Sequence, residues 1–233
     1  MIKGLQIKTP PLDVFQQMAV DEIICDSLPE KFILRFYNWR ETGITFGYSQ
    51  RHKFVTDAVI KANKQNLQIT RRPTGGGIVY HETDLTFSFI FHYPGESFKP
   101  VEIYKRIHSA INSEYARAGR KLNLLDKKET NYDINNPIMD CFQKPVDMDI
   151  LCEGKKALGG ALRKFGDYML YQASLQIYKA RDNSCFHEDI IAKAFSKEFN
   201  IDWIDTTLSE MQVETLEKLK QSKYLTDGWN KRI

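Results

Sequence analysis

Three consecutive glycines at 75–77, between two strand-like stretches, constrain this chain more than any other feature of its sequence. The stretches 68–72 and 78–81 are rich in β-branched residues, and glycine adopts turn conformations that other residues avoid. Arg71 and Arg72 precede the turn, and guanidinium groups bind carboxylates and phosphates. The segment therefore predicts either a loop whose main-chain amides approach a ligand or a glycine-rich hairpin turn. No Gly-Lys-Ser/Thr follows the glycines, which excludes a Walker loop.

A second glycine-rich stretch, at 159–160, follows a pair of lysines, Lys155 and Lys156. A lysine packed against such small residues can contact a substrate carbonyl and act in proton transfer. The same residues also fit a solvated turn that carries two surface lysines. The local sequence therefore gives Lys156 two interpretations, one chemical and one structural.

The four cysteines are candidates for a nucleophile rather than for disulfides. Cys25, Cys141, Cys152 and Cys185 show no C-x-x-C spacing, so we expect free thiols and no zinc site. Cys141 lies in a short segment before a predicted strand, where a nearby cation would favour its thiolate. The alternative is an ordinary buried thiol. The histidines have no metal-ligand spacing, so we predict no metal site.

The composition argues against several broad classes of protein. The chain has 233 residues, and its net charge of +3 is too small to indicate nucleic-acid binding. The N-terminus lacks the apolar segment of a signal peptide, and no apolar run reaches the roughly 18 residues of a membrane span. We therefore expect a cytoplasmic protein that binds neither nucleic acid nor membrane. The mild basic excess suits an acidic protein partner.

Hydrophobic spacing predicts an α+β fold with a mixed, mostly antiparallel sheet and flanking helices. Phe87, Phe89 and Phe91 alternate as in a half-buried strand, so we expect these rings in the core rather than in a ligand pocket. The polar stretch 127–137 is expected to be a loop. The predicted strands are 32–37, 42–48, 68–72, 78–81, 85–93, 147–151 and 168–178, and the predicted helices are 13–28, 55–65, 101–119, 189–199 and 208–221.

Four stretches together resemble the family of lipoate- and octanoate-attaching enzymes, which shares its catalytic fold with biotin protein ligases. The stretch 18–22 is similar to the family's "NMAxDE", 34–50 to "LRxYxW…SLGxxQ", 71–88 to "RRxTGGGAVxH" followed by "DLTYS", and 156–163 to "KIxGxAQR". The motifs also follow the family's order. The resemblance implies a single catalytic domain of the biotin/lipoate protein ligase type over 1–233, with 187–233 as a helical C-terminal tail.

The segment 141–145 is similar to the "CFxxP" segment of the cysteine-dependent octanoyltransferase branch of this family. The resemblance implies that Cys141 takes an octanoyl (or lipoyl) group from an acyl carrier protein, with octanoyl-acyl carrier protein as the donor. Cys141 would then pass it to a lysine of a lipoyl-domain protein, such as the glycine cleavage H protein. Lys156 would polarise the carbonyl or shuttle the proton, and no cofactor is required. The residues implied to bind substrate are Arg72, Thr74, Gly75, Gly76, Gly77, His81, Gly159 and Ala161.

Two rival functions stay open at this stage. An ATP-dependent lipoate ligase would use ATP and Mg²⁺ to make an acyl-adenylate without Cys141, although the stretch after residue 176 is short for the accessory domain of many such ligases. The second rival function is that of a paralogue that binds a lipoyl domain or an acyl carrier without turnover. Leu162 replaces the family's glutamine, and 171–173 replaces its "HHG" or "HQG". Biotin transfer fits the glycine motif less well.

Overall fold

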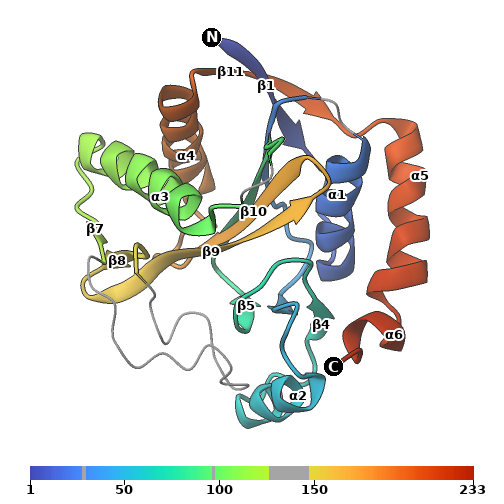
Figure 1. The fold of residues 1–233 in the computed structure, drawn as a ribbon. Helices are drawn as coiled ribbons and strands as arrows, with labels where there is room; N and C mark the ends of the chain where they lie inside the picture. Colours follow the sequence, from blue (N-terminus) through green and yellow to red (C-terminus); the bar gives the residue numbers. More distant parts are fainter. Residues whose placement is uncertain (28–29, 96–97, 126–146) are drawn as a thin grey trace.

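The computed structural model describes residues 1–27, 30–95, 98–125 and 147–233, and Figure 1 shows their arrangement. A large mixed sheet crosses the molecule, a smaller sheet lies beside it, and helices cover the large sheet on both faces. Cys141 and the expected loop 127–137 lie outside the described residues. Within the described ranges, no helix is both long enough and apolar enough to cross a membrane.

Within the described residues, the large sheet has eight strands in the order β11-β1-β2-β6-β10-β9-β8-β7. These strands are β1 (Ile2–Lys8), β2 (Phe32–Phe36), β6 (Leu85–His92), β7 (Asn123–Leu124), β8 (Ile150–Cys152), β9 (Lys155–Phe165), β10 (Tyr168–Leu175) and β11 (Ile201–Thr207). β1 pairs in parallel with β2 and with β11, whereas the other neighbouring strands of the described sheet pair antiparallel. The expected mixed, mostly antiparallel sheet is therefore confirmed.

A smaller sheet in the order β4-β3-β5 carries the two ends of the glycine loop. Its elements are β3 (Gly43–Phe46), β4 (Gln68–Arg71), β5 (Val79–His81) and the covering helix α2 (His52–Lys61). β3 lies between β4 and β5, so the glycines connect two strands that do not pair with each other. The hairpin interpretation of 68–81 is therefore wrong, because a hairpin joins adjacent paired strands.

Helices pack on the two faces of the large sheet (Figure 1). α1 (Val14–Ser27), α3 (Pro100–Arg117) and α4 (Ser184–Phe199) lie against the sheet. α5 (Glu210–Leu219) packs on α1, and α6 (Asp227–Asn230), which follows a π-helical turn (Lys220–Tyr224), packs beside β4 of the small sheet. α3 and α4 bury apolar residues against one face of the sheet. α1 buries apolar residues against the other face, where Ile33 and Ile90 of the sheet cluster with Ile23 of α1, and α5 packs on the outer side of α1. The apolar residues of α1, α3 and α4 thus hold these helices on the sheet.

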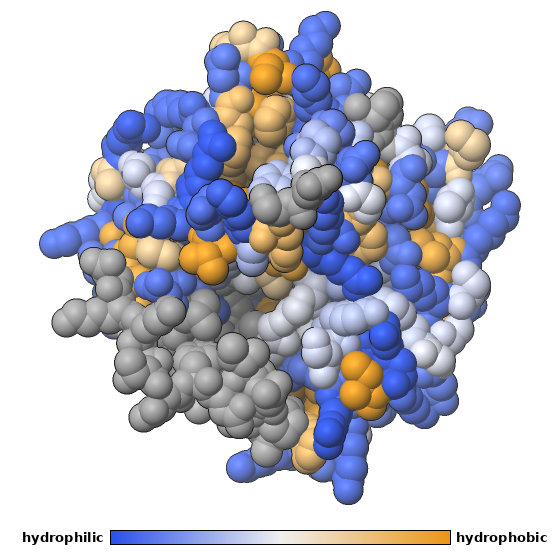
Figure 2. All heavy atoms as spheres, in the orientation of Figure 1, coloured by the Kyte–Doolittle hydropathy of each residue, from blue (hydrophilic) through white to orange (hydrophobic). Residues whose placement is uncertain are grey.

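The apolar side chains lie mainly inside these layers. Phe87, Phe89 and Phe91 of β6 are buried in the cluster under α3 and α4, which confirms their prediction as core residues. Figure 2 shows a mainly hydrophilic face in the orientation of Figure 1, with hydrophobic residues in small, separate groups. Burial of this apolar surface is the main favourable contribution to folding.

The sequence patterns do not predict β1, β9 or β11. β9 holds Gly159 and Gly160, which have low β-propensity, and its stability comes from eight paired positions along β10. β11 carries two exposed aspartates, Asp202 and Asp205, which interrupt its apolar pattern; an end strand that pairs on one side with β1 can expose them to solvent. The segment 187–233 is therefore not wholly helical, since it contributes β11 to the large sheet. The single-domain boundary itself stays a prediction.

Candidate active site

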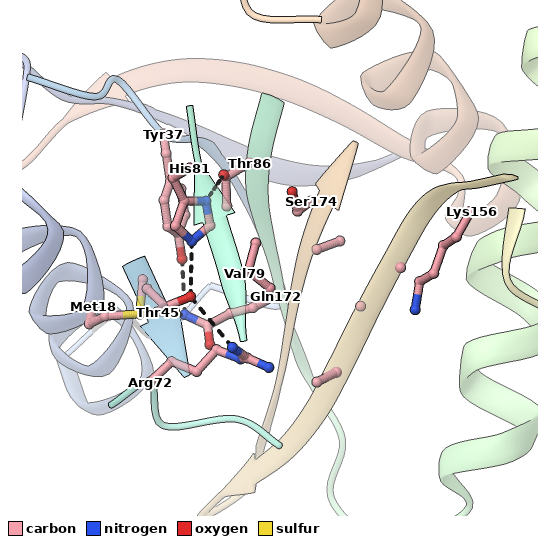
Figure 3. Close-up of a pocket in the computed structure, with 14 residues that line it drawn as sticks. Met18, Tyr37, Thr45, Arg72, Val79, His81, Thr86, Lys156, Gln172 and Ser174 are labelled. Atoms are coloured by element: carbon pink, nitrogen blue, oxygen red, sulfur yellow. Dashed lines mark hydrogen bonds between the residues drawn. The ribbon is translucent and has the colours of Figure 1, made fainter. Parts of the chain in front are cut away.

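A pocket lies between the two sheets, and Figure 3 shows the residues that line it. Its walls are Met18, Tyr37, Thr45, Arg72, Val79, His81, Thr86, Lys156, Gly159, Gly160, Ala161, Gln172, Ala173 and Ser174. These residues come from α1, from just past the end of β2, from the small sheet and its loop, and from the adjacent strands β6, β10 and β9. Lys156 extends from β9 on the opposite side of the pocket from His81 and Arg72. The pocket thus has a cationic side chain on each side.

Asp84 is a buried carboxylate behind one wall of the pocket. Its Oδ2 accepts hydrogen bonds from the hydroxyls of Thr86 and Ser174, each at 2.6 Å, and lies 2.9 Å from Nδ1 of His81. Burial by itself would raise the carboxyl pKa, but the charge of His81 and these hydrogen bonds outweigh it and lower the pKa to about 2. Asp84 is therefore ionised at neutral pH and holds the His81 ring in one orientation.

His81 and Arg72 meet at the hydroxyl of Thr45. Nε2 of His81 lies 2.9 Å from Thr45 Oγ1, and Nη1 of Arg72 donates to the same oxygen at 3.4 Å. The His81 ring stacks on Trp39 with a centroid distance of 4.4 Å. Nε and Nη2 of Arg72 donate to the carbonyl of Gly75 at 3.0 and 2.5 Å. The two predicted substrate-binding side chains are thus fixed by one hydrogen-bonded group.

Gln172 connects the glycine loop to the base of the pocket. Its Oε1 accepts a hydrogen bond from Thr74 at 2.6 Å, and its Nε2 donates to Asp21 Oδ2 at 2.7 Å and to the Tyr37 hydroxyl at 2.9 Å. Tyr37 in turn donates to Asp21. Burial, followed by the charge of Asp21, raises the pKa of Tyr37 well above its ordinary value, so the phenol keeps its proton. The side chain of Thr74 is therefore held in place by Gln172, which is itself held by Asp21 and Tyr37.

The main chain of the glycine loop packs closely against Gly47. A Cβ on Gly47 would overlap the carbonyl of Gly76, so no larger residue fits there. Gly76 itself has a φ of 89°, which L-residues rarely adopt. Gly75, Gly76 and Gly77 are not among the residues that line the pocket of Figure 3. The loop shapes that pocket through its neighbour Arg72 instead.

Arg71 has a different role from Arg72. Its buried guanidinium donates to the carbonyls of Tyr48 and Gln50, both at 2.7 Å, and to those of Trp229 and Asn230, at 3.1 and 2.8 Å. These bonds tie α6 to β4. Because backbone carbonyls surround the group, Arg71 holds the fold together, and of the two arginines only Arg72 lines the pocket.

Lys156 lies at the start of β9 with its ammonium group beside a buried carboxylate. Its Nζ is 2.8 Å from Oδ2 of Asp149, and the two side chains are 5% and 0% exposed. The side chain crosses Gly159, where a Cβ would overlap Cε and lie 2.5 Å from Nζ. The solvated-turn interpretation is therefore wrong for Lys156, although Lys155 is exposed. A buried lysine in a pocket wall can act on a bound carbonyl.

The structure brings several predicted site residues together, while their chemical roles stay predictions. Those that line the pocket are Arg72, His81, Lys156, Gly159 and Ala161, and Thr74 is buried behind it. The proposed nucleophile Cys141 lies outside the described residues. Among the described residues, no group of three His, Cys, Asp or Glu side chains is placed to hold a metal ion.

The sequence analysis does not single out several residues that build the site. Asp84 follows His81 by three positions within the matched motif, and Gln172 lies within the stretch that departs from the family pattern. Asp149 stands between the apolar residues Met148 and Ile150. A charged residue inside a predicted buried strand is itself a signal, because a buried charge needs a partner. For Asp149 that partner is Lys156.

Comparison with known sequences finds relatives over most of the chain. Residues 13–184 match the family model described as the lipoyl protein ligase A/B catalytic domain. The octanoyltransferase LipM of Lysinibacillus sphaericus is 29% identical, and the match covers 91% of this chain and 93% of that protein. The octanoyltransferase LipM of Carboxydothermus hydrogenoformans is 25% identical over 92% of this chain and 93% of that protein.

Solved structures share the fold. A lipoate-protein ligase A bound with ATP has a TM-score of 0.76 and 22% identity, and the match covers 99% of each chain. The bi-partite lipoate protein ligase of Thermoplasma acidophilum has a TM-score of 0.73 and 21% identity over 99% of this chain and 96% of that one. The expected catalytic-domain fold of the biotin/lipoate ligase type is therefore confirmed.

Proposed function

Because the chain belongs to the lipoyl protein ligase A/B catalytic-domain family, we propose that it is an acyltransferase that moves an octanoyl group onto a lysine of a lipoyl-domain protein. Curated relatives that match over nine-tenths of the chain are octanoyltransferases, which favours octanoyl transfer over the ligase reaction. The observation that carries the proposal is the position of Lys156, an ammonium group held by Asp149 in the wall of a pocket.

The reaction consists of two acyl transfers through Cys141. Its thiolate attacks the octanoyl thioester of an acyl carrier protein, a new C–S bond forms, and the carrier thiolate leaves and takes up a proton. The ε-amine of the acceptor lysine then attacks the octanoyl-Cys141 thioester. A C–N bond forms, the amine loses a proton, and the Cys141 thiolate is released. The donor thioester is already activated, so this route needs no cofactor.

Lys156 acts on the carbonyl that is attacked in each transfer. Its ammonium group stabilises the negative charge that develops on the carbonyl oxygen, or carries the proton between amine and leaving group. Gly159 and Ala161 are the proposed contacts of the acyl chain on β9. The small side chain of Ala161 leaves space in the pocket wall, whereas the space over Gly159 holds the Lys156 side chain. The other proposed substrate contacts are Arg72, Thr74, Gly75, Gly76, Gly77 and His81.

The proposed partners are octanoyl-acyl carrier protein as donor and a lipoyl domain, such as that of the glycine cleavage H protein, as acceptor. A bi-partite lipoate protein ligase with the same fold was studied with its E2 lipoyl domain, which supports a lipoyl domain as acceptor. Neither nucleic acid nor membrane takes part in the proposed reaction.

Intact-mass measurement tests the covalent step. After incubation with octanoyl-acyl carrier protein, the wild-type protein is expected to gain one octanoyl group and to lose it when a lipoyl domain is added. Cys141→Ala should prevent the gain. Cys185→Ala is the matched control, because Cys185 is an exposed thiol that should leave the adduct unchanged. An adduct that persists in Cys141→Ala would contradict the role of Cys141.

A lipoate ligase is the second candidate, because a structure with the same fold was solved with bound ATP. Arg72 and Lys156 line the pocket and are cations that would face an acyl phosphate. Supplying ATP, Mg²⁺ and lipoate would then yield acyl-AMP in both the wild type and Cys141→Ala. Binding of a lipoyl domain without either product would identify a non-catalytic protein.

A further inference from the structure

The ammonium group of Lys156 belongs to a hydrogen-bonded chain that extends away from the pocket into α3. Oδ2 of Asp149 pairs with Lys156 Nζ at 2.8 Å, and Oδ1 of the same carboxylate accepts a hydrogen bond from the Tyr104 hydroxyl at 2.5 Å. The Tyr104 oxygen in turn accepts a hydrogen bond from the main-chain N–H of Gly160 at 3.1 Å. Both oxygens of Asp149 are therefore engaged, and the chain returns to the pocket wall at Gly160.

Both ends of this chain depend on glycine. A Cβ on Gly159 would occupy the space of the Lys156 side chain, and a Cβ on Gly160 would lie 2.6 Å from the hydroxyl oxygen of Tyr171. Lys156 can therefore lie flat across β9 only because position 159 has no side chain. The direction of its ammonium group is set by Asp149, since a four-carbon side chain has several rotamers and the carboxylate selects among them.

The aromatic side chains that pack against Tyr104 carry no charge. Its ring stacks on His108 with a centroid distance of 3.9 Å, and Nε2 of His108 lies 2.6 Å from the Tyr171 hydroxyl. Burial, followed by the charge of Lys156, lowers the pKa of His108 to about 3, so this ring is neutral at pH 7. Burial and the nearby Asp149 raise the pKa of Tyr104, which keeps its proton. Neither ring therefore adds a charge that would disturb the ion pair between Lys156 and Asp149.

We propose that Asp149 and Tyr104 are positioning residues that hold the Lys156 ammonium group toward the reacting carbonyl. Asp149 acts on Lys156 directly, and Tyr104 acts through Asp149 while it anchors the carboxylate to the Gly160 amide. This inference rests on the proposed acyl transfer for its catalytic consequence. Misplacing a catalytic group by about 1 Å can cost on the order of 100-fold in rate, so the effect should appear in kcat rather than in KM.

Steady-state kinetics on the full chain test the proposal. Asp149→Asn is expected to lower kcat by about 100-fold, with the KM for the octanoyl donor changed by less than about twofold. Tyr104→Phe keeps the stacked ring but removes the hydroxyl, and an intermediate loss of about 10-fold in kcat is expected. Tyr115→Phe is the matched control, because Tyr115 is a buried tyrosine of α3 whose hydroxyl bonds His187 instead. Unchanged kcat in both test variants would overturn the proposal.

A second measurement does not depend on turnover. The Nζ resonance of Lys156, assigned by its loss in Lys156→Arg, should be visible in ¹H–¹⁵N spectra of the wild type because its ion pair is buried. In Asp149→Asn the resonance should be lost, because the ammonium protons exchange faster with water. It should weaken in Tyr104→Phe and stay unchanged in Tyr115→Phe. An unchanged resonance in Asp149→Asn would refute the positioning role. A wild type that shows this resonance pattern but transfers no acyl group would refute the proposed function instead.

Discussion

Arg71 and Asn230, 159 positions apart in sequence, bind each other's main chain. The Arg71 guanidinium donates to the Asn230 carbonyl at 2.8 Å, and the Asn230 side-chain oxygen accepts from the Arg71 N–H at 2.8 Å. Trp229 adds a third link by donating its indole N–H to the Arg71 carbonyl at 2.8 Å. These bonds attach α6 to β4, the strand that leads into the glycine loop. Because Arg72 directly follows Arg71, the same bonds also restrict the position of Arg72.

Substitution Asn230→Ala should destabilise the protein. The Asn230 side chain also donates to the carbonyls of Tyr224 and Thr226 at 2.7 and 3.1 Å, so its loss leaves several main-chain groups unpaired. We expect a loss of about 2–3 kcal/mol in the free energy of unfolding. Urea denaturation measures it. The control is Lys231→Ala, whose exposed ion pair with Asp227 should contribute less than about 1 kcal/mol. Equal losses of stability in Asn230→Ala and Lys231→Ala would argue that the bonds between Asn230 and Arg71 do not stabilise the fold.

Substitution Gly159→Ala should reduce both activity and stability. The added methyl group would displace the Lys156 side chain, which would break its buried ion pair with Asp149. We expect kcat to fall by about 100-fold, as for other displaced catalytic groups, and the free energy of unfolding to fall by about 3 kcal/mol. Gly95→Ala is the control, since a Cβ at Gly95 meets no atom of the described residues within 4 Å apart from its chain neighbours. Wild-type kcat in Gly159→Ala would show that the direction of Lys156 is unimportant.

Acid should destabilise the protein through Asp84. Its folded-state pKa of about 2 lies below the ordinary value of 3.8, so the ionised form is favoured in the folded state. That stabilisation is fully present above pH 4 and is lost as the pH falls toward 2. It amounts to about 2 kcal/mol, because one pKa unit corresponds to about 1.4 kcal/mol. Unfolding curves between pH 6 and pH 2.5 measure it.

The comparison for that titration is Asp84→Asn. The variant should be less stable than the wild type at pH 6 and should show a smaller loss of stability between pH 4 and pH 2.5. Parallel pH profiles of wild type and variant would mean that another carboxylate causes the acid sensitivity.

Substitution Thr74→Val should weaken the base of the glycine loop. Valine has a similar shape but no hydroxyl, so Oε1 of the buried Gln172 would lose the hydrogen bond that Thr74 donates. We expect a loss of about 1–3 kcal/mol in the free energy of unfolding. Thr215→Val serves as a control, because Thr215 is exposed and bonds only within its own helix. A neutral result at Thr74 would mean that Gln172 finds another donor.

The regular part of the fold is visible in the sequence. The alternation of Phe87, Phe89 and Phe91 predicts β6, and helical spacing predicts α1 and α3 to within a few residues. β9 is not predicted, because its two glycines and its lysines lack a strand pattern and are held by β10, a strand reached only after the turn. Long-range pairing of this kind overrides local propensity.

The site is predictable where a motif is local and unpredictable where it joins distant elements. Arg72 and His81 lie in one motif, and both reach the pocket. Asp149 and Tyr104 are separated by 45 positions, so their hydrogen bond depends on how α3 packs beside β8 and β9. The same is true of Arg71 and Asn230. No local pattern encodes which distant group will satisfy a buried charge.

The place of β1 in the large sheet affects the growing chain during synthesis. β1 (Ile2–Lys8) is made long before one of its two neighbours, β11, which consists of residues 201–207. Until that segment emerges from the ribosome, one edge of β1 presents unpaired N–H and C=O groups, which are a template for incorrect strand pairing. The nascent protein should therefore benefit most from chaperones while translation is under way, and pulse-labelled chains shorter than 201 residues should be more sensitive to protease than the finished protein.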